Sequence, residues 1–267
     1  MIDVGLTLDR LSRFGARAAL RSSSILLILA AWEILARPRF VSPLILPSPE
    51  AVFWALVRFA TSGDLAYHGA ATLTRALTGF IAAVICGVTL GTMMARIDVA
   101  RRLLEPLFFF GNSIPKITLY PVFIFLFGLG DASKIALIFL ECLYPITIQT
   151  LAGMRGAERV LVWAAQNYGA SARQMLWNVL LPSAGPAIFA GVRIALPVSL
   201  ILTIITEIIG DNRGLGYVVA FASASFEPER ALAAIAVIGV VGFLFDRGLA
   251  FARTTILYWQ KDAQPLA

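Results

Sequence analysis

Long apolar runs recur along this chain, and they constrain its fold more than any other feature of the sequence. The chain is 59% hydrophobic and 14% charged, whereas soluble domains contain about 25% charged residues. A helix of about 20 apolar residues can cross a bilayer, because it pairs its own backbone polar groups in lipid. We therefore predict an all-α membrane protein, a polytopic bundle of about six transmembrane helices. The expected spans are residues 22–36, 70–95, 103–128, 135–151, 187–209 and 231–251.

The sequence shows no sign of a second domain or of a catalytic centre. No linker-like or low-complexity stretch divides it, so we expect one domain over residues 1–267. His68 is the only histidine, and Cys86 and Cys142 lie in apolar runs without the spacing of a metal site. We therefore expect neither an enzyme site nor a metal site. The net charge of +6 does not indicate nucleic-acid binding, because the arginines cluster at the ends of the apolar runs.

The third apolar run, residues 103–128, contains three prolines. Pro106, Pro115 and Pro121 free backbone groups within the bilayer, and these groups need a neighbouring helix or the water of a cavity as partner. The run is therefore either a wall of a transport pathway or a kinked helix with a structural role.

A polar segment, residues 158–182, separates the fourth and fifth apolar runs. Residues 158–168 contain neither glycine nor proline and predict a short helix, which Gly169 ends in the left-handed conformation. Ser171 and Gln174 have the spacing of a capping box that opens a second helix, and we expect Pro182 to close that helix. The 158–182 segment is thus predicted to be a helix–turn–helix that stands in water between two spans.

Small residues in the 158–182 segment follow a specific spacing. They read Ala-Ala, three residues, Gly, nine residues, Val-x-Leu-Pro, at Ala164, Ala165, Gly169, Val179, Leu181 and Pro182. This spacing resembles the cytoplasmic coupling loop of ATP-binding-cassette (ABC) importer permeases of type I, the binding-protein-dependent family. The family has a Glu before the two alanines, where this chain has Trp163. The alternative is an ordinary loop whose small residues share no role.

Other segments resemble the same family, and the similarity covers about residues 65–255. Residues 127–134 contain the Phe-Gly-x-Gly…Lys pattern of the family, and residues 214–217 contain its Gly-Leu-Gly-Tyr. Leu-Pro-Ser-Pro at residues 46–49, followed by a helix with proline at its first position, resembles the nitrate, sulfonate and taurine branch.

The resemblance implies a permease subunit whose transport is driven by ATP hydrolysis on separate subunits. No Gly-x-x-x-x-Gly-Lys-Ser/Thr sequence occurs, so ATP and Mg²⁺ would be bound by partners and this chain would need no cofactor. The implied partners are a second copy of the chain, two ABC ATPase subunits docked on the 158–182 segment, and a periplasmic or lipid-anchored solute-binding protein, besides membrane lipids. The implied function is import of a small solute, such as a nitrate-, sulfonate- or taurine-like anion or a related organic compound, by alternating access.

Ionisable side chains within apolar runs are costly in lipid and therefore indicate a pathway or an ion pair. Glu141 and Glu207 are the deepest acids, and Lys116 and Arg193 are their possible partners. The four residues either line a polar pathway or form interhelical ion pairs. We favour ion pairs, because acids lining an anion pathway would repel the solute.

Basic residues are distributed unevenly over the two sides that six spans define. Twelve lie on the side of the termini and six on the other, which obeys the positive-inside rule. We therefore expect a multi-pass protein with both termini in the cytoplasm, and the resemblance implies that the membrane is the bacterial inner membrane. The twelve are Arg10, Arg13, Arg17, Arg21, Arg96, Arg101, Arg102, Arg155, Arg159, Arg173, Arg253 and Lys261, and the six are Arg37, Arg39, Arg58, Lys134, Arg213 and Arg230.

Two other functions fit parts of the sequence. An ion-coupled secondary transporter would use Glu141 and Glu207 as proton or sodium sites. Such transporters usually consist of two related halves, and this chain shows no internal repeat. An assembly or regulatory subunit would have no use for a coupling loop. The permease subunit is therefore the favoured interpretation.

Overall fold

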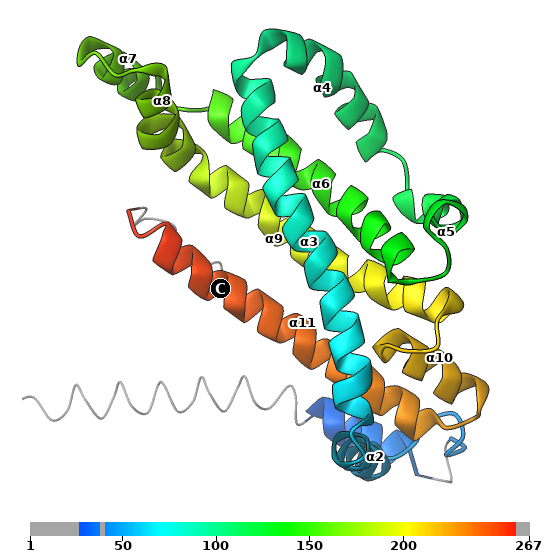
Figure 1. Cartoon of the computed structure of the whole chain (residues 1–267). Coiled ribbons are helices and arrows are strands. Elements are labelled where there is room, and N and C mark those ends of the chain that lie inside the picture. The colour runs from blue at the N-terminus through cyan, green and yellow to red at the C-terminus, as the bar shows by residue number, and fades with distance from the viewer. Residues whose placement is uncertain (1–26, 38–40, 260–267) are drawn as a thin grey trace, which may run out of the picture.

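The computed structural model describes residues 27–37 and 41–259, which form an elongated bundle of helices without any strand (Figure 1). Residues 27–35 of the first expected span are helical, and residues 22–26 of that span lie outside the described residues. The predicted all-α membrane fold is confirmed. The further helices are α2 (Pro49–Thr61), α3 (Asp64–Arg96), α4 (Asp98–Asn112), the 3₁₀-helix η1 (Lys116–Leu119), α5 (Tyr120–Phe127), α6 (Asp131–Arg155), α7 (Arg159–Asn167), α8 (Ala172–Gln174), the π-helix η2 (Met175–Leu180), α9 (Leu181–Gly210), α10 (Leu215–Ala224) and α11 (Pro228–Ile256).

Four helices in the described part of the chain are long and apolar enough to cross a membrane: α3, α6, the helix Ala172–Gly210 and α11. They contain the expected spans at residues 70–95, 135–151, 187–209 and 231–251. The third expected span is sharply bent, because α4 and the helical residues Lys116–Phe127 form an angle of 96°. This pair makes a fifth span if its two arms cross together. The break lies at residues 113–115, where Pro115 removes a backbone donor.

Helices α3, α6 and α9 pack together and form the centre of the bundle. Ile138, Cys142 and Ile146 of α6 are fully buried there. Helix α3 approaches α6 closely because Gly91 has no side chain: a Cβ at this position would lie 2.6 Å from the Cβ of Thr150. Small residues permit such contact in lipid, where apolar side chains have little hydrophobic drive to associate.

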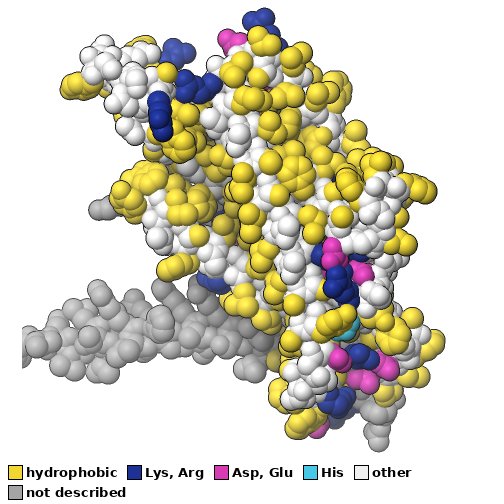
Figure 2. Space-filling view, in the orientation of Figure 1, with side chains coloured by type: hydrophobic (Ala, Val, Ile, Leu, Met, Phe, Trp, Pro, Cys, Tyr) yellow, Lys and Arg dark blue, Asp and Glu magenta, His cyan; other side chains and the backbone are white. Residues whose placement is uncertain are grey.

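The two ends of the bundle differ. At one end α7 and α8 project beyond α6 and α9, and at the other end α2 and α10 pack against α11 (Figure 1). Leu215 and Val218 of α10 are buried in a cluster with Ala234 of α11 and Phe59 of α2. The face in Figure 2 is largely apolar, with a group of acidic and basic side chains toward the end where α2 and α10 lie.

Candidate coupling site and charge network

The first helix of the 158–182 segment, the turn after it and the start of the second helix form as the sequence predicts. Helix α7 is followed by Gly169, whose φ of +72° is left-handed. The N–H of Ser171 donates to Oε1 of Gln174 at 2.8 Å, and the N–H of Gln174 donates to Oγ of Ser171 at 3.4 Å, which completes the capping box. These local predictions are confirmed. Together the turn and the cap fix the angle between α7 and the helix that follows.

The prediction that Pro182 ends the second helix was wrong. Residues Ala172–Gly210 form one helix of 39 residues, in which Met175–Leu180 are π-helical and α9 continues from Leu181. Proline lacks the N–H that would donate to the preceding turn, and its ring crowds the carbonyl group four residues earlier. The wider turns of the π-helix directly before Pro182 accommodate both effects.

Helix α7 exposes aromatic and small side chains. None of its residues is buried, and Ala164 is exposed while Ala165 is half-buried. Trp163 is 59% exposed and Tyr168 is 92% exposed. Helix α7 lies outside the helices that are long and apolar enough to cross a membrane. Arg96 of α3 donates from Nη1 to the carbonyl oxygen of Ala172 at 3.1 Å, which fixes the segment to the bundle.

Six charged side chains form a network at the opposite end of the bundle, and we call it the Arg75 network. It comprises three cations and three anions and is therefore neutral. It joins α3, α6, the C-terminal end of α9 and the loop after α9. Its members are Arg75, Asp131, Lys134, Glu207, Asp211 and Arg213.

Arg75 occupies the centre of this network, and its side chain is 2% exposed. Its Nη1 lies 2.9 Å from Oε1 of Glu207 and 2.6 Å from Oδ2 of Asp211. Its Nη2 lies 2.7 Å from Oδ1 of Asp131, which also pairs with Arg213 at the exposed rim. Removal of one partner from a buried ion pair leaves an uncompensated charge, so these contacts hold α3, α6 and α9 in one arrangement.

Two Gly-Leu-Gly turns meet at the Arg75 network. The turn of residues 128–130 accepts two hydrogen bonds from Nζ of Lys134, each of 3.3 Å. In the second turn, residues 214–216, Gly216 donates its N–H to Oε2 of Glu207 at 2.9 Å. Gly214 has φ +115° and lies so close to the Glu207 carboxyl group that a Cβ would overlap it. The turns therefore bring backbone groups directly around the buried charges.

Glu207 pairs with Arg75, which was absent from the sequence-based predictions, and not with Lys116 or Arg193. Arg193 instead lies 3.7 Å from Asp246 of α11, and both side chains are about half exposed. The signal for Arg75 was present, because an arginine within an apolar run indicates a buried partner. Its partners could not be identified from the sequence, because they follow it by 56 and 132 residues.

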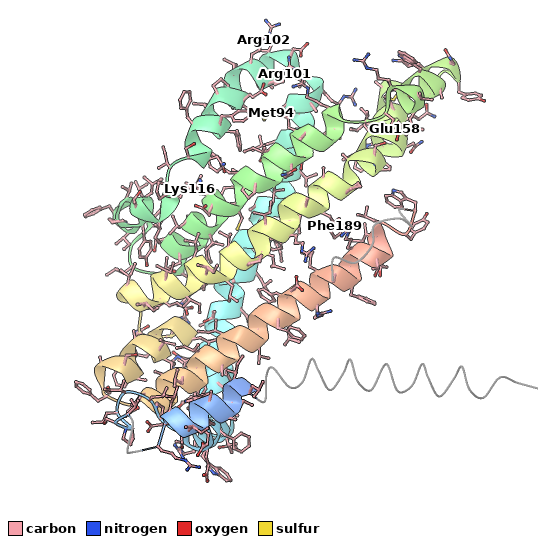
Figure 3. All side chains as sticks on the ribbon, turned by 180° about the vertical axis from the view of Figure 1, so that it is seen from behind. Met94, Arg101, Arg102, Lys116, Glu158 and Phe189 are labelled. Carbon is pink, nitrogen blue, oxygen red and sulfur yellow. The ribbon has the colours of Figure 1, made fainter. Side chains whose placement is uncertain are left out.

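Lys116 and Glu141 form one of the ion pairs considered from the sequence. Nζ of Lys116 lies 3.7 Å from Oε1 of Glu141 and 4.4 Å from the centroid of the Tyr144 ring. Lys116 is the first helical residue after the bend between α4 and α5 (Figure 3). The pair therefore joins the bend to α6.

The chain matches a known family over most of its length. The family described as "Binding-protein-dependent transport system inner membrane component" matches residues 71–252. The taurine transport system permease protein of Escherichia coli (strain K12) is 34% identical, over 93% of this chain and 92% of that protein. A putative aliphatic sulfonates transport permease protein of the same strain is 34% identical, over 87% and 88% of the two chains. The formylaminopyrimidine transport permease protein of Halalkalibacterium halodurans is 29% identical, over 88% and 94%.

A solved structure supports the fold independently. A chain of the methionine ABC transporter in an inward-facing conformation superposes with a TM-score of 0.53 at 20% identity, over 75% of this chain and 97% of that chain. At this identity the likeness concerns the fold alone. Family, relatives and fold agree. The chain therefore belongs to the family of inner membrane components of binding-protein-dependent transport systems, and it is a permease subunit of an ABC importer.

Proposed function

We propose that two copies of this chain form the translocation unit of an importer in a bacterial inner membrane, with two ABC ATPase subunits docked on the 158–182 segments. The ATPases bind ATP and Mg²⁺, and this chain binds no cofactor. A solute-binding protein delivers the solute to the end with α2 and α10. Basic residues support this orientation, with both termini in the cytoplasm. Arg101, Arg102 and Glu158 lie at the same end of the bundle (Figure 3).

One continuous helix is the observation that carries the proposal. The 39 residues Ala172–Gly210 extend over about 58 Å at 1.5 Å per residue. They connect the capping box of the 158–182 segment to Glu207 in the Arg75 network. A displacement of α7 and α8 by an ATPase therefore moves the far end of α9.

The proposed mechanism is alternating access. ATP binding draws the two ATPases together, each ATPase pulls on its docked segment, and the bundle opens outward to receive the solute. Hydrolysis restores the inward-open state. The ATPases must contact the 158–182 segment differently in the two states, because a ligand shifts an equilibrium only by its differential affinity.

The proposed solute is a small organic compound with an anionic group, such as a sulfonate. The relatives named for taurine and for aliphatic sulfonates support this class. An ion-coupled mechanism at Glu207 is less well supported, because this carboxylate already accepts hydrogen bonds from Thr72, Arg75 and Gly216.

Replacement of Gly169 by valine tests the coupling role. No atom lies within 4 Å of a Cβ built on Gly169, so valine disturbs the backbone of the turn and no neighbouring side chain. The left-handed conformation costs such a residue about 1–2 kcal/mol, and we expect α7 to lose its docking angle. Co-purification of the ATPases and ATP-driven solute uptake in proteoliposomes should both fall about tenfold.

The control for this variant is Gly239→Val in α11, where a Cβ also meets no atom within 4 Å. It should leave co-purification and uptake close to the wild-type level. Wild-type levels of both in the Gly169→Val protein would show that the 158–182 segment is not the joint with the ATPases.

A further inference from the structure

A cavity of about 380 Å³ opens between the C-terminal parts of α3 and α6 and helix α4, and we call it the α4–α6 cavity. Its volume lies within the range of small-molecule pockets, roughly 300–1,000 Å³. Along α6 its lining begins at Thr147 and continues to Arg155, the last residue of the helix. These 8 residues (155 − 147) correspond to about 12 Å along the axis. The cavity therefore extends from the end of a membrane span toward the middle of that span.

The walls of the α4–α6 cavity are mostly apolar. Met94 of α3 is buried, and Phe108 of α4 and Ile148 of α6 are half-buried. Phe109 of α4 is 60% exposed, and Thr147 supplies the single hydroxyl group of the lining. An ordered water needs about two to four polar partners, and these walls offer few. An apolar group fits them better, and around a membrane span the abundant apolar group is a lipid acyl chain.

Two charged side chains line the α4–α6 cavity, Glu105 of α4 and Arg155 of α6. Oε2 of Glu105 lies 3.8 Å from Nε of Arg101, whereas the salt bridges of the described residues do not include Arg155. The charges of α4 balance, because Asp98 and Glu105 face Arg101 and Arg102 in number. Arg101 and Arg102 lie at the same end of the bundle as Met94 (Figure 3). Helix α4 and Arg155 together therefore carry one surplus positive charge.

We infer that the α4–α6 cavity binds one phospholipid with an anionic headgroup, whose phosphate pairs with Arg155 and whose acyl chain lies against Phe108 and Phe109. Basic pockets between membrane-spanning helices bind such headgroups. Phosphatidylglycerol carries one negative charge and balances the surplus charge, whereas phosphatidylethanolamine has no net charge. The inference goes beyond the proposed function. It holds for either orientation of the chain, because the end of α6 defines the site and the side of the membrane does not.

Native mass spectrometry of the full-length permease, purified in detergent with any subunits that remain bound, tests this inference. The protein is titrated with phosphatidylglycerol or with phosphatidylethanolamine of the same acyl chains. The wild-type protein should bind the first phosphatidylglycerol about fivefold more tightly, as expected for one basic residue near an anionic headgroup. Arg155→Gln should lose this preference, Arg155→Lys should retain it, and Glu105→Gln should increase it. Ala152→Phe fills the exposed side of the cavity and should weaken the binding of both lipids.

The matched control is Arg253→Gln, which removes an arginine from the last turn of α11, outside the lining of the cavity, and should leave the preference unchanged. A wild-type preference in the Arg155→Gln protein would overturn the inference. A reduced preference in the Glu105→Gln protein would also overturn it, because a purely structural role of the two charges predicts a loss in both variants. Binding of neither lipid by the wild-type protein, as expected if a second copy of the chain covers the cavity, would overturn it as well.

Discussion

An Arg75→Met permease should be markedly less stable than the wild-type protein. Methionine approximates the shape of the arginine stem, but it leaves Glu207 and Asp211 buried with Lys134 as the remaining buried cation of the network. Removal of one partner from a buried ion pair costs about 3–5 kcal/mol, which is a large fraction of the stability of many proteins, about 5–15 kcal/mol. The thermal unfolding midpoint of the purified complex in detergent should fall by roughly 10 °C, and the yield of intact protein should fall with it.

Two further variants distinguish the effect of disrupting the Arg75 network from the effect of removing any arginine. Arg193→Met removes one partner of a half-exposed pair, and exposed pairs contribute only about 0–1 kcal/mol, so its midpoint should stay near the wild-type value. The double variant Arg75→Met with Glu207→Gln restores equal numbers of cations and anions in the network and should recover part of the loss. If Arg75→Met and Arg193→Met unfold at the same temperature, the Arg75 network does not stabilise the bundle.

A Gly214→Ala permease should be nearly as damaged, although the change adds a single methyl group. The backbone at Gly214 has φ +115°, and the carboxyl group of Glu207 occupies the place of the new Cβ. Crowding in a well-packed site costs about 1–3 kcal/mol, and backbone strain adds about 1–3 kcal/mol. We expect a lower unfolding midpoint and slower uptake, because the Glu207 carboxylate must leave its contacts with Arg75 and Gly216.

Gly248→Ala in α11 is the matched control for this change, since a Cβ there meets no atom within 4 Å. Alanine stabilises a helix interior by about 1 kcal/mol relative to glycine, so the midpoint should rise slightly. A Gly214→Ala protein that unfolds at or above the temperature of the Gly248→Ala protein would contradict the close contact between Gly214 and Glu207.

The features that were predictable from the sequence are those with local causes. The capping box depends on Ser171 and Gln174, three residues apart, and the left-handed turn depends on Gly169 alone. The apolar runs identified four spans, because the hydropathy of a segment depends on its own residues and not on its packing partners. Lys116 and Glu141 were singled out because a charge within an apolar run is rare.

The features that were missed depend on geometry between distant or crowded groups. Pro115 indicated a break, but the 96° angle follows from the packing of both arms. Pro182 indicated a helix end, but the wider turns of the π-helix Met175–Leu180 accommodate the proline ring and the helix continues. The two Gly-Leu-Gly turns gave no sign of a shared role, because the Arg75 network that joins them exists only in the folded bundle.

The order of synthesis gives the Arg75 network a further consequence. Asp131 and Glu207 follow Arg75 by 56 and 132 residues, so the whole of α3 is translated before any of the counterions of Arg75. Arg75 is the twelfth of the 33 residues of α3. A guanidinium within a nascent span opposes insertion by at most about 2.5–3.5 kcal/mol, the cost at a helix centre, and the apolar remainder of α3 offsets this. A polypeptide that ends before Glu207 would contain the two buried cations Arg75 and Lys134 of the network with Asp131 as their single carboxylate. The positive and negative charges of the Arg75 network are thus equal in number only once Glu207 has been translated. This charge balance distinguishes nearly full-length chains from chains that end earlier.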